Sequence, residues 1–271
     1  FLGKVGEDAF GHFLKKTLED VGVKTSGLVF SEEARTALAF VSLREDGERE
    51  FMFYRHPSAD MLFTPDEVDF ECFQKAKIFH TGSISLISEP CRSATLKALE
   101  YARKNQLLIS YDPNLRLVLW PDEAAAKQGI LSIWDQANLI KISEDELFFL
   151  TEIEDKDEAV KALWHDHLYA MIVTLGKDGC LFYTSDFHGF VPGFHVNAVD
   201  TTGAGDGFVA GFLSGLLANP DALQSPSHLE GICHQANAVG ALTTTQRGAI
   251  PALPTLNELN AFLESQEKSH P

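Results

Sequence analysis

The chain has 271 residues, 45% of them hydrophobic, which is enough for one well-filled domain core. Its 39 acidic and 22 basic residues give a formal net charge of −17. A surface this acidic repels phosphate backbones and anionic lipids, so we expect neither a nucleic acid nor a membrane among its partners. The four cysteines form no CxxC pair. That spacing favours reduced thiols and a cytoplasmic protein, or a plastid stromal one if a transit peptide has been removed.

The first residues read as the end of a strand that runs into a loop, Phe1-Leu2-Gly3 and then Lys4-Val5-Gly6. A domain rarely begins at such a point, so an N-terminal segment is expected to precede Phe1. Residues 8–21 then place apolar side chains at helical spacing and predict a helix.

Two runs rich in β-forming residues, 36–43 and 49–54, predict a β-hairpin because Asp46-Gly47 lies between them. Apolar residues occupy both faces of the second run, so we expect this hairpin to contact a second subunit and to make the protein a homodimer. The predicted domains are a lid at 35–60 and a main domain at 1–34 and 61–271.

After the hairpin, strands alternate with helices. This order predicts an α/β fold with a mostly parallel sheet flanked by helices on both faces. Ligands of such sheets lie beyond the carboxyl ends of the strands. The predicted strands are 77–81, 107–112, 138–142 and 170–175, and the predicted helices are 89–104, 121–135, 207–218, 231–242 and one beginning at Ser143.

Residues 200–206, Asp-Thr-Thr-Gly-Ala-Gly-Asp, precede one of these helices. The small side chains of Gly203, Ala204 and Gly205 leave backbone N–H groups uncovered at a helix N-terminus, which predicts an anion hole for a phosphoryl group. Asp206 follows in the first turn and can take a proton from an attacking hydroxyl. Taken alone, the same residues could only turn the chain and complement the helix dipole.

Residues 200–211 resemble the second signature of the PfkB (ribokinase-like) carbohydrate kinases, and 49–55, 79–86, 112–116 and 247–251 resemble the plant-like fructokinases of that family. The resemblance implies a Rossmann-like ribokinase fold with a β-lid over the sugar. It implies ATP-dependent phosphorylation of a sugar primary hydroxyl, with D-fructose as acceptor, and Mg²⁺ and K⁺ as cofactors.

Two alternatives stay open: another sugar acceptor (ribose, 2-keto-3-deoxygluconate or a nucleoside), and a fructokinase-like regulatory protein without turnover. Family members also carry an N-terminal strand and a Gly-Gly-x-x-x-Asn segment that hold the sugar. Neither occurs in these 271 residues. A chain without them is expected to bind ATP but to phosphorylate fructose poorly.

The resemblance also implies roles for single residues, each with a plainer reading beside it. Arg116 would join the anion hole in catalysis, or form a surface salt bridge. The sugar contacts would be Arg35, Arg55, Gly82, Asn114 and Asp206, although the two arginines could equally be solvated ion-pair partners. The nucleotide would contact Lys141, Thr174, Gly176, Lys177, Gly179, Asn237 and Gly248. For these, Lys141 could merely solvate a strand end, the 174–179 loop could be an ordinary hairpin turn, and Asn237 could be a surface amide.

The cations would contact Ser143, Glu146, Asp200 and Thr202, although Ser143 and Glu146 also read as a helix capping box.

Overall fold

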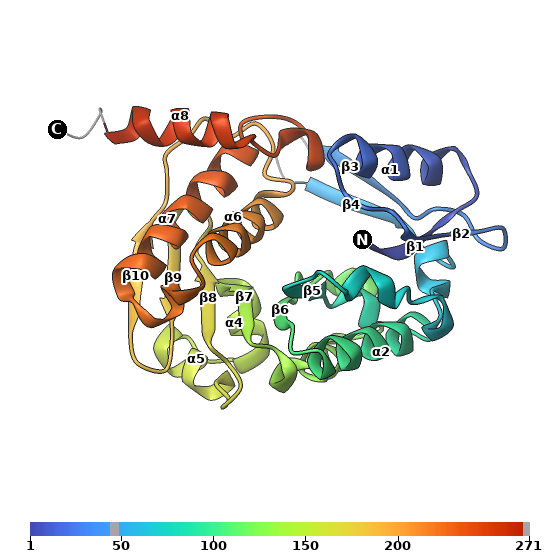
Figure 1. The fold of residues 1–271 in the computed structure, drawn as a ribbon, viewed down its shortest axis with the longest axis horizontal. Coiled ribbons are helices and arrows are strands. Elements are labelled where there is room, and N and C mark those ends of the chain that lie inside the picture. Colours follow the sequence, from blue (N-terminus) through green and yellow to red (C-terminus); the bar gives the residue numbers. More distant parts are fainter. Residues whose placement is uncertain (44–48, 268–271) are drawn as a thin grey trace. The chain divides into compact units, whose positions relative to one another are not determined.

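The computed structural model describes residues 1–43 and 49–267. The chain divides into two compact units, here called unit 1 (residues 1–109 and 114–133) and unit 2 (residues 110–113 and from Trp134 onward), and Figure 1 draws both. The predicted Asp46-Gly47 turn lies outside the described residues. The predicted division into a lid and a main domain stays a prediction.

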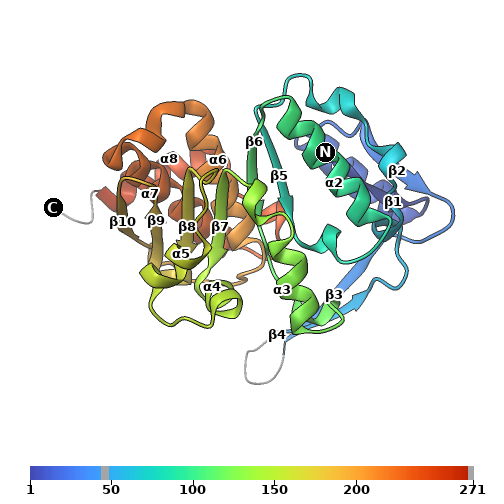
Figure 2. The ribbon, with the colours of Figure 1, turned by 90° about the horizontal axis from the view of Figure 1, so that it is seen from below.

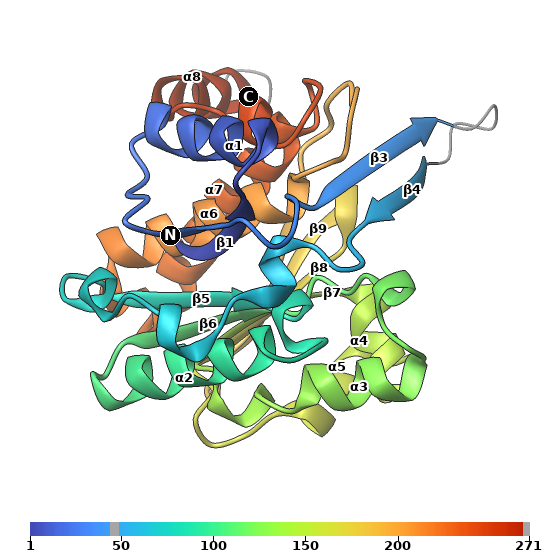
Figure 3. The same ribbon diagram turned by 90° about the vertical axis from the view of Figure 1, so that its right-hand side faces the viewer.

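Unit 1 opens with a parallel strand pair, β1 and β2. Strands β3 and β4 pair antiparallel as a separate two-stranded sheet, as the sequence predicts for a hairpin (Figure 3). The elements of unit 1 are β1 (Leu2–Gly6), α1 (Ala9–Asp20), β2 (Gly27–Ser31), β3 (Leu38–Leu43), β4 (Arg49–Tyr54), β5 (Ile78–Gly82), α2 (Cys91–Lys104) and α3 (Glu123–Leu131).

Strand β6 (Leu108–Asp112) runs across the division between the units. Strands β5 to β10 form one six-stranded sheet in the order β10-β9-β8-β7-β6-β5. The pairs β6–β7 and β7–β8 are parallel, and β9 and β10 extend the sheet antiparallel. The remaining elements are β7 (Leu139–Ser143), α4 (Glu144–Thr151), α5 (Lys156–Leu163), β8 (Ala170–Thr174), β9 (Gly179–Tyr183), β10 (His188–Pro192), α6 (Ala204–Ala218), α7 (Pro226–Thr243) and α8 (Leu256–Glu267).

Helices cover both faces of the sheet in unit 2, as the alternation of elements predicts. Helices α6 and α7 lie on one face of β7 to β10, and α4 and α5 lie on the other (Figure 2). The central strands are therefore apolar on both sides: the consecutive residues Leu139 and Ile140 of β7, and Met171 and Ile172 of β8, point to opposite faces and are all buried. Such continuous apolar runs are typical of parallel strands between two helix layers.

Glycines set the distance between α6 and α7, which run side by side in Figure 1. Gly207, Gly211 and Gly215 recur at every fourth residue and so share one face of α6. A Cβ on Gly211 would lie 3.0 Å from Cα of Ala236 in α7. The small-residue stripe therefore lets the two backbones approach closely and fixes α6, whose first turn carries the predicted anion hole.

All four cysteines are free thiols, as their spacing predicts. Burial raises the pKa of Cys91 to about 11, so this thiol is protonated at neutral pH. Over the part of the chain that the structure describes, no helix combines the length and hydropathy needed to cross a membrane.

Candidate active site

The first turn of α6 carries the predicted anion hole. Gly203 caps the helix with a left-handed φ of +81°, and a Cβ there would lie 3.0 Å from Ala249, so the position requires glycine. The first helical hydrogen bond runs from Gly207 N–H to the Gly203 carbonyl (2.8 Å). Ala204 N–H donates to the Thr201 carbonyl (3.3 Å), so the expectation that all three N–H groups are uncovered is wrong for Ala204, because the preceding turn folds back on it.

Asp200 ties the segment before α6 to the chain after α7. Its Oδ1 accepts from the Thr202 N–H (2.9 Å), and its Oδ2 accepts from the Gly248 N–H (3.0 Å). The N–H groups of Val199 and Asp200 both donate to the Thr244 carbonyl (2.7 and 3.0 Å). The structure therefore brings together three residues predicted for the cations and the nucleotide, at the base of the α6 turn.

A cavity of about 340 Å³ opens beside this turn within unit 2. Its volume is in the range of small-molecule sites. Residues predicted from the sequence form much of its wall: Thr174, Gly176, Lys177, Gly179, Ala204, Gly205 and Asn237. The sequence analysis missed Phe194, His195 and Phe208. No local pattern indicates them, because Phe194 reaches the wall by packing on Phe262 of α8 (ring centroids 5.2 Å apart).

The loop between β8 and β9 is both a hairpin turn and a wall of this cavity. Gly176 and Gly179 have positive φ angles of 58° and 112°, and Leu175 N–H donates to the Gly179 carbonyl (2.8 Å). A Cβ on Gly179 would lie 2.1 Å from the Val191 carbonyl oxygen of β10. The two readings of the 174–179 loop are therefore compatible.

Asn237 is not a surface amide, so that reading of it is wrong. It is buried in α7, where its Nδ2 donates to the carbonyls of Val191 (3.2 Å) and Pro192 (3.1 Å). Helix α7 packs on β9 and β10, and this contact between distant segments covers the amide. The side chain thus joins the cavity wall to the edge strand of the sheet.

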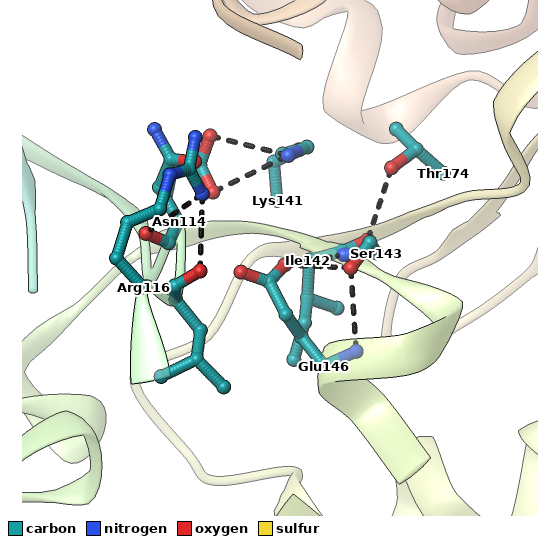
Figure 4. A network of polar contacts seen from close by, with 9 residues as sticks. Asn114, Arg116, Lys141, Ile142, Ser143, Glu146 and Thr174 are labelled. Carbon is teal, nitrogen blue, oxygen red and sulfur yellow. Dashed lines mark hydrogen bonds and ion pairs between the residues drawn. The ribbon is translucent and has the colours of Figure 1, made fainter. Parts of the chain in front are cut away.

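Lys141 does not solvate a strand end but forms a buried ion pair (Figure 4). Its Nζ lies 3.2 and 3.3 Å from the two carboxylate oxygens of Asp112. Burial raises the pKa of Asp112 to about 6, with the charges of Glu146 and Asp206 adding to the rise and Lys141 opposing it. The sequence analysis assigned Asp112 no role, because its partner lies 29 residues away in the chain.

Ser143 and Glu146 form the capping box of α4. Glu146 Oε2 accepts from the N–H (2.9 Å) and the hydroxyl (2.8 Å) of Ser143, and the Glu146 N–H donates back to Ser143 Oγ (3.3 Å; Figure 4). The capping reading is therefore confirmed. Among the residues that the structure describes, no three His, Cys, Asp or Glu side chains converge on a metal position. A role of Ser143 and Glu146 near a cation stays a prediction.

Asn114 and Arg116 belong to unit 1, on the loop after β6. Asn114 has a positive φ of 45°, a conformation that asparagine tolerates better than most residues. The exposed Arg116 turns back on its own loop, and its Nη1 donates to the carbonyls of Leu115 (3.0 Å) and Asn114 (3.4 Å; Figure 4). No salt bridge of Arg116 is among the described ion pairs, and its catalytic role stays a prediction.

Arg55 lines a second cavity of about 410 Å³, within unit 1. Its side chain is 7% exposed, and its Nε donates to Asp60 Oδ2 at 2.7 Å, so Arg55 forms an ion pair, but a buried one and not the solvated one expected from the sequence. Arg35 is exposed, and Gly82 ends β5. Neither residue is part of the cavity wall. Contacts of these three residues with a sugar stay predictions.

The sequence pattern of the "pfkB family carbohydrate kinase" matches residues 1–256. The chain belongs to this family, so the resemblance drawn from its motifs is confirmed, and with it the class of enzyme, a carbohydrate kinase.

A relative named "Probable fructokinase-3" from Arabidopsis thaliana is 54% identical over 269 residues, which are 99% of this chain and 78% of the relative. A crystal structure of fructokinase with bound ATP from Xylella fastidiosa is 34% identical with a TM-score of 0.89, over 98% of this chain and 85% of the other. A fructokinase structure from Vibrio cholerae in fructose-, ADP- and calcium-bound form is 38% identical with a TM-score of 0.89. The match covers 97% of this chain and 84% of the other. These similarities confirm the ribokinase-like α/β fold.

Proposed function

We propose that this pfkB-family kinase transfers the γ-phosphoryl group of ATP to the primary hydroxyl of D-fructose and releases ADP and fructose 6-phosphate. The observation that carries the proposal is the first turn of α6. It places Gly205 and Ala204 in the wall of the 340 Å³ cavity, with Asp206 next along the same turn. The names and ligands of the similar fructokinases support fructose and ATP as the substrates.

In the proposed reaction Asp206 is the general base. The fructose hydroxyl oxygen forms the new P–O bond, its proton passes to the Asp206 carboxylate, and ADP leaves with the electrons of the broken bond. The N–H groups at Gly203 to Asp206 and the helix dipole of α6 stabilise the charge on the moving phosphoryl group. Arg116 supplies further donors, which suit phosphate oxygens because the guanidinium is a planar fork.

Mg²⁺ is proposed to accompany ATP. Glu146 and Asp206 both raise the pKa of Asp112, so carboxylates gather near one another here and a divalent cation would relieve their repulsion. Since no three acidic, His or Cys side chains converge among the described residues, the protein would hold the ion through water and phosphate oxygens, with Glu146 and Ser143 nearest. The ion would neutralise phosphate charge.

K⁺ is proposed at the segment that Asp200 braces. The Asp200 carboxylate orders the backbone of Thr202 and Gly248, and carboxylate and backbone oxygens are the ligands that such a cation prefers. A monovalent ion there would stiffen the turn that precedes the anion hole. Activity measured in KCl against an equal concentration of a tetraalkylammonium salt tests the proposal, with higher activity expected in KCl.

We further propose that two copies of the chain associate through β3 and β4. Three apolar side chains on this pair of strands are exposed: Phe40 (55%), Met52 (58%) and Tyr54 (61%). The rings of Phe40 and Tyr54 pack edge-on, with their centroids 5.4 Å apart. Such an apolar group is more typical of an interface than of a free hairpin. Met52→Glu should convert a dimer into monomers in sedimentation experiments, and a monomeric wild type would contradict this proposal.

The substrate assignment is tested by ADP release over a panel of acceptors: fructose, ribose, 2-keto-3-deoxygluconate and a nucleoside. Fructose is expected to give the highest kcat/KM. A higher kcat/KM with another acceptor would assign that acceptor, and not fructose, as the substrate of this kinase. Normal binding of ATP with no ADP release for any acceptor, measured on a protein that carries the Gly-Gly-x-x-x-Asn segment, would favour the regulatory alternative.

A further inference from the structure

The carboxyl ends of β6 and β7 place two opposite charges side by side. The parallel register pairs Ser110 with Leu139 and Tyr111 with Ile140. One step further along, Asp112 and Lys141 stand next to each other. Neighbouring residues in register point to the same face of a sheet, which explains the separations of 3.2 and 3.3 Å between the ammonium and the carboxylate.

The pair is buried, with side-chain exposures of 5% for Asp112 and 11% for Lys141. A buried carboxylate is costly unless a cation neutralises it, and the same holds for a buried ammonium. The carboxylates of Glu146 and Asp206 make the surroundings of Asp112 more negative. Lys141 supplies a compensating positive charge within contact distance.

Lys141 also touches the first turn of α6. A Cβ built on Gly205 would lie 3.3 Å from the Lys141 Nζ, so the ammonium lies beside that glycine, on the side where a side chain would project. A lysine has a long flexible stem, and a free ammonium would sample many positions. The contact with Asp112 restricts it to this one.

We propose that Asp112 is a positioning residue, which holds the ammonium of Lys141 against the first turn of α6, where it meets the phosphoryl group during transfer. The inference rests on the proposed kinase reaction and adds to it a residue that the sequence motifs do not assign. Asp112 acts through Lys141, because its own carboxylate is almost fully buried. Gly205 belongs to the same interaction, since a Cβ there would press on the ammonium at 3.3 Å.

The test compares Asp112→Asn, Lys141→Met and the double variant in the ADP-release assay with fructose. Asp112→Asn keeps the shape of the side chain but removes its charge, and we expect kcat to fall about ten-fold while KM for fructose stays within about two-fold. The double variant should be no slower than Lys141→Met alone, since Asp112 has nothing left to position. Asp145→Asn removes an exposed carboxylate of the same unit and should leave kcat unchanged.

If Asp112→Asn slows the Lys141→Met enzyme as much as it slows the wild type, the two residues act independently and the proposal is wrong. The double variant leaves neither buried charge unpaired, so its kcat can be compared with that of Lys141→Met even if Asp112→Asn alone unfolds. A double variant slower than Lys141→Met would overturn the proposal.

Failure of the kinase assignment gives a different result. If the wild type phosphorylates no sugar, calorimetric binding of an imido analogue of ATP replaces kcat. Asp112→Asn should then weaken binding as much as Lys141→Met does, and the double variant should bind no more weakly. Unchanged binding in Asp112→Asn would overturn the positioning role.

Discussion

The cavity described in unit 2 and the one described in unit 1 have walls of different composition. In unit 2 the wall includes glycines at two turns, Gly176 and Gly179 after β8 and Gly205 at the start of α6. In unit 1 the wall includes long side chains held in ion pairs, Arg55 with Asp60 (2.7 Å) and Lys4 with Glu67 (2.6 Å). Glycines in a wall form no side-chain interaction, so a substitution of a nearby side chain costs little stability. Removing one member of a buried ion pair leaves the other charge uncompensated and destabilises the protein. Changes at the α6 turn should therefore affect chemistry first, and changes in unit 1 should affect folding first.

The largest expected effect is that of Asp206→Asn on catalysis. Asparagine keeps the shape but cannot accept the proton, so turnover should fall by roughly a hundred- to ten-thousand-fold. Binding of an ATP analogue and the melting temperature should stay close to those of the wild type. Asp221→Asn, an exposed carboxylate in the turn after α6, is the control. A kcat within a few-fold of the wild type would remove Asp206 from its role as base.

Asp112 is an exception in unit 2, because a buried charge there contributes to the pH dependence of stability. Its pKa is raised from 3.8 to about 6, so between these values the folded state binds more protons than the unfolded state. The free energy of unfolding should therefore fall as pH rises from 4 to 6, by up to about 3 kcal/mol for this group.

Asp112→Asn removes the titrating group. Urea unfolding at pH 4, 5, 6 and 7 should therefore show a smaller decrease in the free energy of unfolding for the variant than for the wild type. Lys141, Glu146, Asp206 and Tyr111 are the other titratable groups that interact with this carboxylate. If the free energy of unfolding changes equally with pH in the wild type and in Asp112→Asn, the raised pKa of Asp112 is contradicted.

In unit 1 the corresponding test is Arg55→Met. The change leaves Asp60 without this buried partner, and we expect about 2 kcal/mol of destabilisation. Binding of an ATP analogue in unit 2 should be unchanged. Lys104→Met, which removes an exposed i,i+4 pair with Glu100, is the matched control and should change stability by less than about 0.5 kcal/mol. Equal stability of the two variants would show that the buried pair of Arg55 contributes no more to stability than an exposed pair.

The smallest expected effects come from two glycines of the helix pair in unit 2. Gly211→Ala pushes a methyl group to within 3.0 Å of Ala236 and should destabilise the protein by about 1–2 kcal/mol. Gly231→Ala of α7 meets open space and should stabilise it by about 0.5–1 kcal/mol, since alanine favours the helix. Thermal unfolding of both variants checks whether each change lowers or raises the stability of the protein. A stabilising Gly211→Ala would mean that α6 and α7 can separate at no cost.

Residues of the α6 turn could be read from the chain alone. The Gly203-Ala204-Gly205-Asp206 motif is local, and small side chains before an apolar helix specify an N-terminus with accessible backbone wherever the rest of the chain lies. The same is true of the Ser143–Glu146 capping box and of the alternating strands and helices, because each depends on neighbours a few residues away. The helix boundaries were less accurate: α7 begins at Pro226 rather than at residue 231, since proline suits a first helical turn.

Contacts between distant segments could not be read in that way. Asp112 and Lys141 become partners because β6 and β7 are neighbours in register, a pairing that neither strand specifies by its own composition. Asn237 is buried because α7 packs on β9 and β10, and Phe194 reaches the cavity because α8 packs behind it. Local periodicity is set by backbone geometry over a few residues, whereas the burial and pairing of these side chains depend on which elements the whole fold places beside them.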